Sequence, residues 1–243
     1  MENVRLLPLG DSGITVEFGN EISETVKSRV TAFVARLERE KTEGILEIVP
    51  TYRSASVYYD PSVMGYMNLV TLIERVLNTS DEGSQKEKTV VEIPVWYSRE
   101  SGPDLEFVAS HSGKTEDEVI AIHSRPEYLI YMLGFTPGFP YLGGMDESIA
   151  TPRLETPRVK IEAGSVGIAG SQTGIYSLDS PGGWRLIGKT PVKLFDIKRE
   201  KPTLLESGQY LKFVPIGKDE YIKIKELCEK GVYSCKTYKK EVL

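Results

Sequence analysis

The sequence predicts an α+β protein with two domains, a small mixed domain over residues 1–88 and a mainly β domain over residues 89–243. Two observations support this prediction. The first segment alternates pairs of short apolar runs with amphipathic helical stretches, in the order strand, strand, helix, repeated once. In the second segment short apolar runs alternate with glycine and proline, and 11 of the 22 glycines lie between Gly134 and Thr190. This pattern predicts short strands joined by tight turns, in a closed or nearly closed sheet.

The composition is that of a soluble globular protein, with 40% hydrophobic and 27% charged residues. The net charge of −5 gives no electrostatic signal for nucleic acid or for an anionic membrane surface. The N-terminal residues lack the apolar region of a secretory signal, and no run is long enough to span a membrane. Cys228 and Cys235 lack metal-binding spacing, and two histidines are too few for a histidine-based metal site. We therefore expect a cytoplasmic protein with two free thiols and no bound metal.

The first domain is expected to form one sheet covered by two helices, an α/β sandwich. Ser23 can cap the first helix, whose apolar positions recur every three or four residues and form one stripe. The second helix is expected to follow Pro61. The four strands are expected in two hairpins, 4–9 with 14–18 and 45–50 with 54–59.

A polar stretch over residues 78–88 is the predicted linker. A strand over 89–97 follows, in which Pro94 indicates an edge or a bulge. Asp104 can cap a short helix, and Thr115 with Glu118 has the spacing of a capping box for another. This helix should end near His123, because Pro126 disfavours its continuation. Near the C-terminus we expect a strand over 209–215, a strand or a helix over 218–228, and a solvated basic tail over 236–240.

One segment matches a nucleotide-binding motif in its letters alone. The residues from Gly183 to Thr190 fit the P-loop pattern G-x-x-x-x-G-K-[ST]. A phosphate-binding loop needs small residues between a buried strand and a helix N-terminus, whereas the interior here is Trp-Arg-Leu-Ile and Pro191 follows. We therefore interpret the segment as part of a β-hairpin and Lys189 as an ordinary basic residue.

The turns of the glycine-rich region carry polar side chains that are suited to binding. Arg153, Arg158 and Lys160 place three cations within eight residues, and two of them follow prolines that stiffen the chain. We favour an anion site there over a solvated basic loop, because arginine binds carboxylate and phosphate through two parallel hydrogen bonds. His123 is either a general acid or base, or a cation that complements the dipole at a helix C-terminus. Trp184 belongs either to an apolar pocket or to the core, together with Phe135, Phe139 and Tyr141.

Three stretches also carry a resemblance to a known family. They are GFTPGFPYLGGMD at 134–146, AGSVGIAGSQTGIYSLDSPGGW at 163–184 and IGKTPVKLFD at 187–196, with the two Pro-Arg pairs between the first and second. This ordered series of Gly, Pro and Arg resembles the KipI family, which is also called the family of the 5-oxoprolinase B subunit or the allophanate hydrolase subunit 1 domain. The match is dense over about 70 residues, and the rest of the chain is compatible with it.

The resemblance implies a cyclophilin-like β-barrel as the C-terminal domain. It also implies the B subunit of an ATP-dependent 5-oxoprolinase, which acts with the A and C subunits and is inactive alone. ATP would be a co-substrate of the complex, bound by a subunit that the sequence does not identify. The alternative that it implies is an inhibitor of a sporulation sensor histidine kinase, which would bind the kinase dimerisation helices. A part in a urea-directed carboxylase is less favoured, because the chain is short and shows no biotin-attachment segment.

A lactam is a poor electrophile, so ring opening with ATP needs cations for phosphate and carboxylate and a group that transfers protons. We assign the catalytic roles to His123, Arg153 and Arg158. The predicted substrate-binding residues are Lys160, Gln172, Thr173, Ser180 and Trp184.

Overall fold

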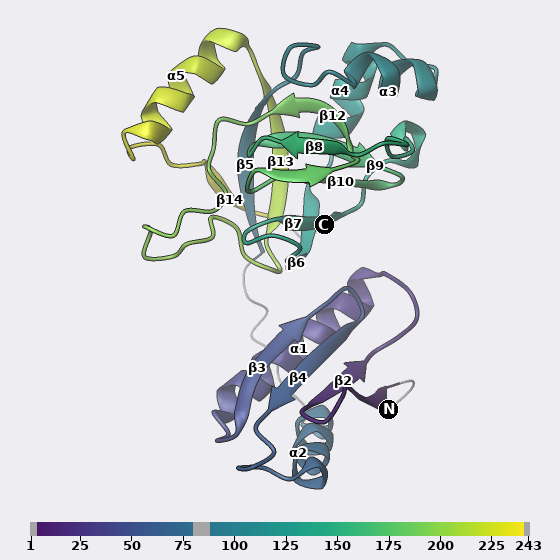
Figure 1. Cartoon of the computed structure of the whole chain (residues 1–243), viewed down its shortest axis with the longest axis vertical. Coiled ribbons are helices and arrows are strands. Elements are labelled where there is room, and N and C mark those ends of the chain that lie inside the picture. The colour runs from purple at the N-terminus through teal and green to yellow at the C-terminus, as the bar shows by residue number, and fades with distance from the viewer. Residues whose placement is uncertain (1–3, 80–87, 241–243) are drawn as a thin grey trace. The chain divides into compact units, whose positions relative to one another are not determined.

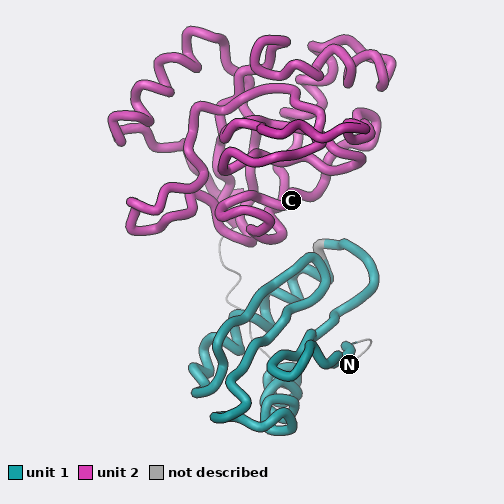
Figure 2. Tube along the Cα trace, viewed as in Figure 1, with its two compact units in different colours: residues 1–86 teal, residues 87–243 magenta. Residues whose placement is uncertain are grey.

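The computed structural model describes residues 4–79 and 88–240, and the chain separates into two compact units, residues 1–86 and 87–243 (Figures 1 and 2). Most of the predicted linker lies outside the described residues. The division of the chain into two folding domains at residue 88 stays a prediction. None of the helices in the described ranges is long and apolar enough to cross a membrane.

Unit 1 contains a four-stranded antiparallel sheet in the order β1-β2-β4-β3. Both predicted hairpins are present. Their strands are β1 (Arg5–Pro8) with β2 (Gly13–Glu17), and β3 (Ile45–Pro50) with β4 (Ser54–Tyr59). The central strands β2 and β4 alternate buried and less buried residues, as expected for a sheet with one face against a core.

Two helices complete the core of unit 1. Helix α1 (Glu24–Glu40) begins after Ser23, whose Oγ accepts a hydrogen bond from the Val26 amide at 3.3 Å, as the sequence predicts. Helix α2 (Tyr66–Asn78) begins later than predicted. The Asp60 carboxylate accepts hydrogen bonds from the amide and hydroxyl of Ser62 and so forms a turn after the strand, and Met64 is buried before the helix starts.

Unit 2 is built on a nearly closed β-barrel (Figure 1). The strand path runs β10-β9-β12-β5-β13-β6-β7, and its end strands β7 and β10 contact each other. A short separate sheet pairs β8 (Arg158–Ile161) with β11 (Ser180–Gly182). The barrel strands are β5 (Thr89–Trp96), β6 (Tyr128–Leu133), β7 (Pro140–Gly143), β9 (Ser165–Ala169), β10 (Gln172–Ile175), β12 (Arg185–Lys189) and β13 (Tyr210–Ile216). The predicted α+β class and near-closed sheet are confirmed, and the cyclophilin-like label stays a prediction.

The strand β5 lies in the centre of this sheet. It pairs in parallel with β13 on one side, and on the other side with β14 (Thr237–Lys239) near its start and with β12 at Trp96. Pro94, which cannot donate a backbone hydrogen bond, lies between these last two pairings. The prediction of an edge strand or a bulge at Pro94 is wrong, because β5 is central and its register with β13 is unbroken, but Pro94 lies where the partner on the other side changes from β14 to β12.

Small helices flank the barrel. Helix α3 (Leu105–Ser112) and helix α4 (Glu116–Ser124) follow β5, and a short 3-10 turn η1 (Glu147–Ile149) follows β7. The predicted capping box is confirmed, because Thr115 Oγ1 accepts from the Glu118 amide and Glu118 accepts from the Thr115 amide. The buried core contains apolar side chains of β5, β6, β9, β13 and the two helices.

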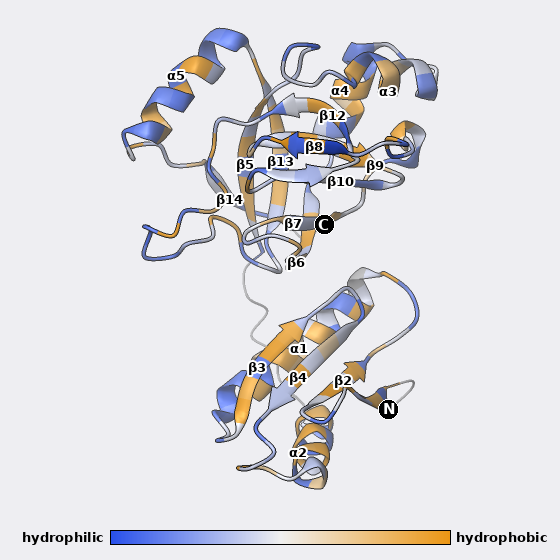
Figure 3. Cartoon of the chain, in the orientation of Figure 1, coloured by the Kyte–Doolittle hydropathy of each residue, from blue (hydrophilic) through white to orange (hydrophobic). Residues whose placement is uncertain are grey.

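In the C-terminal region, the structure decides between strand and helix for residues 218–228 and corrects the expected solvated tail at residues 236–240. Residues 218–228 form helix α5 (Lys218–Glu229), whose hydrophilic and hydrophobic residues alternate along its length (Figure 3). The stretch 236–240 is not a free tail, because β14 pairs with β5 and the Lys240 ammonium bonds the Glu127 carboxylate. Open backbone positions beside the first residues of β5 explain this strand, and a charge count does not reveal them.

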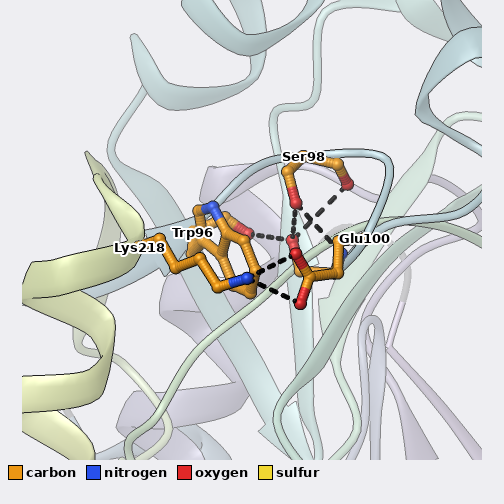
Figure 4. Close-up of polar contacts among 5 residues, drawn as sticks. Trp96, Ser98, Glu100 and Lys218 are labelled. Atoms are coloured by element: carbon orange, nitrogen blue, oxygen red, sulfur yellow. Dashed lines mark hydrogen bonds and ion pairs between the residues drawn. The ribbon is translucent and has the colours of Figure 1, made fainter.

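The N-terminal end of α5 is fixed to the loop after β5 (Figure 4). Lys218 Nζ lies 2.9 and 2.7 Å from the two carboxylate oxygens of Glu100 and 5.2 Å from the centre of the Trp96 ring. Ser98 lies beside Glu100 and receives the Ser101 amide hydrogen bond at 3.0 Å. These contacts hold one end of α5 against the barrel.

The loop after β5 also approaches β12 closely at Gly102, and this gives a first prediction. A Cβ on Gly102 would lie 2.0 Å from the carbonyl carbon of Ile187, which is backbone and cannot move aside. We expect Gly102→Ala to lower the free energy of unfolding by about 3 kcal/mol through overpacking. Urea unfolding followed by circular dichroism measures this change. The control is Gly134→Ala, where the nearest atom is 3.6 Å away, and equal stability of the two variants would contradict the prediction.

Candidate functional site

The carboxylate of Asp104 connects three parts of unit 2. Its Oδ2 accepts a hydrogen bond from the Leu186 amide of β12 at 2.7 Å. The Arg158 Nη2 atom of β8 lies 3.0 Å from Oδ1 and 2.9 Å from Oδ2. Asp104 occupies the N-cap position of α3, as expected, but its side chain makes no capping hydrogen bond. The prediction was therefore right about the position and wrong about the side chain, which bonds partners more than 50 residues away.

Two arginines surround this carboxylate. Arg158 is half-buried and also donates to the carbonyl of Trp184 at 3.3 Å. Arg185 lies 3.7 Å from Asp104 Oδ1, and its guanidinium lies 3.7 Å from the centre of the Phe107 ring. Arg158 is thus held by a protein carboxylate, as a buried charge requires. Its predicted role as a free anion ligand stays a prediction.

Arg153 is exposed, and its backbone is held in place. The bridge between Thr151 and Gly170 and the hydrogen bond from the Leu154 amide to the Gly183 carbonyl, 2.7 Å long, fix the chain on either side of it. Within residues 4–79 and 88–240, Arg153 forms no ion pair with a carboxylate. This arginine therefore presents its charge to solvent from a fixed backbone.

Aromatic side chains lie beside the two predicted arginines. Burial raises the pKa of Tyr176, while a backbone hydrogen bond from Trp184 and the charges of Arg153 and Arg158 act in the opposite direction. Phe139 packs against Tyr176 and Trp184 with ring centres 5.9 and 5.7 Å apart. We call Arg153, Arg158, Tyr176, Trp184 and Phe139 the arginine–aromatic cluster. It is partly core, because Phe139 is buried, and partly surface, because Trp184 is half-buried.

An open depression of about 370 Å³ adjoins this cluster and is lined by residues 133–138. Phe135 lies at its edge, 67% exposed and with a left-handed backbone φ of 61°. Its ring centre is 5.6 Å from that of Phe139. A non-glycine residue in this conformation is uncommon and is found at functional sites.

Three other predicted binding residues lie on β8, β10 and β11. Lys160 forms an ion pair with Asp179 at 2.8 Å, and this hydrogen bond raises the pKa of Lys160. Gln172 is half-buried at the start of β10. The Ser180 hydroxyl oxygen is buried and has no hydrogen-bond partner among the described residues. Within the described residues, none of these three side chains forms a hydrogen bond with a residue of the arginine–aromatic cluster.

His123 lies at the end of α4 and is fully buried. Its Nδ1 is 2.8 Å from the Tyr97 hydroxyl, and its Nε2 is 2.7 Å from the Thr173 hydroxyl. Thr173 donates its own proton to the Gly167 carbonyl at 3.1 Å, so it accepts from Nε2, and Tyr97 donates to Nδ1. This pattern fixes one neutral tautomer of the imidazole.

Burial lowers the pKa of His123 to about 3. The imidazole ring is therefore neutral near pH 7. Its centre lies 4.4 Å from the centre of the Phe213 ring. A cation that complements the helix dipole is excluded by this protonation state. In this conformation the ring also has no surface through which it would meet a substrate directly. Its predicted catalytic role stays a prediction.

The P-loop match forms a strand, as predicted, but it is not part of a hairpin, because its partners β9 and β5 are not its neighbours in the sequence. Residues Arg185–Lys189 form β12, which pairs with β9, and no helix follows Thr190. Lys189 forms an ion pair with Glu162. The geometry of a phosphate-binding loop at a helix N-terminus is absent from this part of the described chain.

Sequence reasoning missed the residues that organise this region. Asp104 holds Arg158, Tyr97 holds His123, and Tyr176 packs against Trp184, yet sequence spacing assigns none of them this role. An arginine that the fold partly buries favours a carboxylate partner, so a partly buried Arg158 implies an acidic residue elsewhere. The sequence contains 35 acidic residues and does not say which one.

Comparison with known proteins gives a consistent picture. The family model of the carboxyltransferase domain, subdomain C and D, matches residues 4–205. The chain is 45% identical over 228 residues to the 5-oxoprolinase B subunit of Bacillus subtilis, covering 90% of this chain and 95% of that protein. Proteins of the same name from Haemophilus influenzae and Escherichia coli O157:H7 are 40% and 37% identical, over 88% of this chain and 99% and 97% of theirs.

Solved structures show the same fold. A conserved uncharacterized protein from Pyrococcus horikoshii is 48% identical, with a TM-score of 0.54, over 89% of this chain and 100% of that one. The urea amidolyase of K. lactis is 21% identical with a TM-score of 0.78, over 98% of this chain and 16% of that one. The second likeness concerns the fold alone.

The buried ion pair of Asp104 gives a prediction for stability. Asp104→Ala leaves the Leu186 amide without its acceptor and Arg158 without its counter-charge, and we expect a loss of about 3 kcal/mol in the free energy of unfolding. A double-mutant cycle with Arg158→Ala should give a coupling of about 1–3 kcal/mol. The control pair is Lys201 and Glu206, whose side chains are 82% and 55% exposed and should couple much more weakly. Strictly additive losses at Asp104 and Arg158 would contradict the assignment.

The buried histidine gives a prediction for pH. The folded-state pKa of about 3 lies below the ordinary value of 6.5, so the neutral ring stabilises the fold fully above pH 6.5. Below pH 6.5 the unfolded chain takes up the proton first, and the contribution falls by roughly 1.4 kcal/mol per pH unit until about pH 3. His123→Gln should remove this dependence, measured by urea unfolding between pH 7.5 and 5. His111→Gln, at the exposed histidine of α3, should keep it, and an unchanged slope in His123→Gln would contradict the prediction.

Proposed function

Because this chain belongs to the family of the carboxyltransferase domain, subdomain C and D, we propose that it is the B subunit of an ATP-dependent 5-oxoprolinase. It opens 5-oxoproline to glutamate together with the A and C subunits. The observation that carries the proposal is the likeness to three proteins named as the B subunit of 5-oxoprolinase, which extends over nearly their whole length. The Gly, Pro and Arg series in the sequence leads to the same expectation.

The reaction needs activation of an unreactive amide. In the proposed sequence the γ-phosphoryl group of ATP passes to the lactam oxygen, and ADP leaves. Water then attacks the activated carbon, the C–N bond breaks, and the nitrogen takes up a proton as the ring opens. A second water releases phosphate from the resulting acyl phosphate and leaves the carboxylate of glutamate. Each step develops or transfers negative charge on oxygen, which fixed cations stabilise.

Arg153 is the residue of the arginine–aromatic cluster that is best placed for this task. Its side chain is exposed, its backbone is fixed, and no carboxylate of the described chain neutralises it. The Tyr176 phenol lies within the field of the same charge. Arg153 therefore faces phosphate or the substrate carboxylate in our proposal, and Trp184 supplies an apolar wall for the ring.

The remaining predicted residues take supporting roles. Arg158 holds β8 against Asp104 and so positions the cluster. His123 positions Thr173 on β10 through a neutral hydrogen bond. Hydrogen bonding of the substrate by Lys160, Gln172 and Ser180 stays a prediction. Inhibition of a sensor histidine kinase also stays a prediction, and no contact within the described ranges favours it over the enzyme subunit.

Reconstitution tests the proposal. We expect glutamate to form from 5-oxoproline and ATP only when this chain is mixed with the A and C subunits. In the assembled complex, Arg153→Ala should lower kcat/KM by about tenfold to a hundredfold, because it removes a cation from a site of developing charge. Coupled detection of ADP and direct detection of glutamate measure both effects.

The matched control is Arg125→Ala, which removes an exposed arginine that is 70% accessible and pairs with Asp146. Its kinetics should equal those of the unmodified complex. Assembly is checked by size-exclusion chromatography for both variants. An assembled complex that forms no glutamate would refute the enzyme-subunit proposal, and unchanged kinetics in Arg153→Ala would remove that arginine from the site.

A further inference from the structure

A second concave site lies in unit 2, and most of its lining residues were not singled out by sequence reasoning. It is a cleft of about 540 Å³ between the end of β12, the loop that follows it and helix α5. Its size is in the range of small-molecule sites. The turn before β9 and the residues after β10 close the remaining sides. We call it the lysine cleft.

The lining of this cleft carries more positive than negative charge, although the chain as a whole is acidic. Four lysines line it and one aspartate, Asp196. Lys189 is paired with Glu162. The other three, Lys193, Lys198 and Lys225, form no ion pair with a carboxylate of the described residues. Ammonium groups that line one cleft without counter-charges create a positive potential there, which favours the binding of an anion.

The single aspartate does not neutralise these lysines. Asp196 Oδ1 accepts the backbone amide of Lys198 at 3.0 Å, which makes it the acceptor of a turn. The Asp196 amide bonds the Pro202 carbonyl at 2.8 Å, and Arg199 Nη1 bonds the Lys193 carbonyl at 3.0 Å. The loop that carries Lys193 and Lys198 is therefore closed by its own hydrogen bonds. Its lysines extend from a fixed backbone.

Helix α5 supplies the opposite wall. Lys218, Tyr221 and Lys225 are three and seven residues apart and so share one face of the helix. Lys218 is held by Glu100 (Figure 4), and the Tyr221 ring centre lies 5.5 Å from that of Trp96. This anchored face places Tyr221 and Lys225 in the cleft lining. Burial raises the pKa of Tyr221, so its phenol keeps a proton to donate near pH 7.

We propose that the lysine cleft binds a small molecule through a phosphoryl group. A phosphoryl group offers up to two negative charges and three acceptor oxygens, which suits several ammonium groups better than the single charge and two oxygens of a carboxylate. Val192 and Phe195 provide apolar surface for the rest of the molecule, and Ile197, 79% exposed, lies at the rim. The site depends only on this chain, so it does not require the reaction proposed above.

Titration of the full chain alone tests the inference. Inorganic phosphate and pyrophosphate are added at low ionic strength and followed by calorimetry, because salt screens exposed charges. We expect saturable binding with one site per chain, and at least a tenfold loss of affinity in the double variant Lys193→Gln with Lys225→Gln. Changing the same two residues to arginine should keep most of the affinity. Thermal unfolding checks that each variant is folded.

The matched control is Lys223→Gln with Lys230→Gln, which removes the same charge from α5 and its C-terminal end outside the cleft lining. Its affinity should stay within about twofold of the original, because these lysines do not contact the ligand. Three results would overturn the inference. They are no saturable binding, an equal loss in the control pair, or affinity for glutarate, a dicarboxylate, that matches that for phosphate. None of these results bears on glutamate formation by the complex, so the two proposals fail separately.

Discussion

The buried carboxylate of Asp104 is the interaction on which the geometry of unit 2 depends. It bonds the backbone of β12 and the guanidinium of β8, while its own backbone begins α3. A charge with 9% of its side chain exposed needs such partners, because an unpaired one would cost several kcal/mol. Each partner lies more than 50 residues from Asp104 in the sequence, so these contacts form only when the small sheet and the barrel are both in place. Within the arginine–aromatic cluster, this carboxylate positions Arg158, which in turn bonds the Trp184 carbonyl.

Inside the barrel, the hydrogen bonds of His123 to Tyr97 and Thr173 form a bridge that likewise joins elements far apart in the sequence. A neutral ring accepts from Tyr97 and donates to Thr173, so both nitrogens and both hydroxyls are satisfied without a charge. The bridge joins α4 to β10, and a slip of one residue in either element would leave buried polar atoms unpaired. His123 and Thr173, which the sequence analysis assigned to catalysis and substrate binding, thus fix how α4 and β10 pack in the barrel. The exposed cations, Arg153 and the lysines of the cleft, are left to meet ligands.

The parts of the fold that were predicted correctly are those with local causes. The capping serine of α1, the capping box of α4 and the two hairpins of unit 1 each depend on residues within a few positions of one another. Asp104, the strand β14 and the start of α2 depend on partners or packing that sequence spacing does not reveal. For the same reason the lysine cleft was missed, because Lys193 and Lys225 are 32 residues apart and become neighbours of one cavity only when α5 folds back. The net charge of the whole chain is negative and therefore does not reveal a local group of lysines.

Strand packing requires two glycines, Gly188 within the false P-loop and Gly164 beside Thr190. A Cβ on Gly188 would lie 2.9 Å from the Trp96 carbonyl oxygen, where β12 crosses β5. Gly164, with φ of 86°, would place a Cβ 2.4 Å from the Thr190 carbonyl oxygen. These positions need glycine because two backbones approach closely, which is a demand of strand packing and not of phosphate binding. The backbone of the motif is therefore engaged in the pairing of barrel strands. In our proposal, side chains of the lysine cleft bind the phosphoryl group instead.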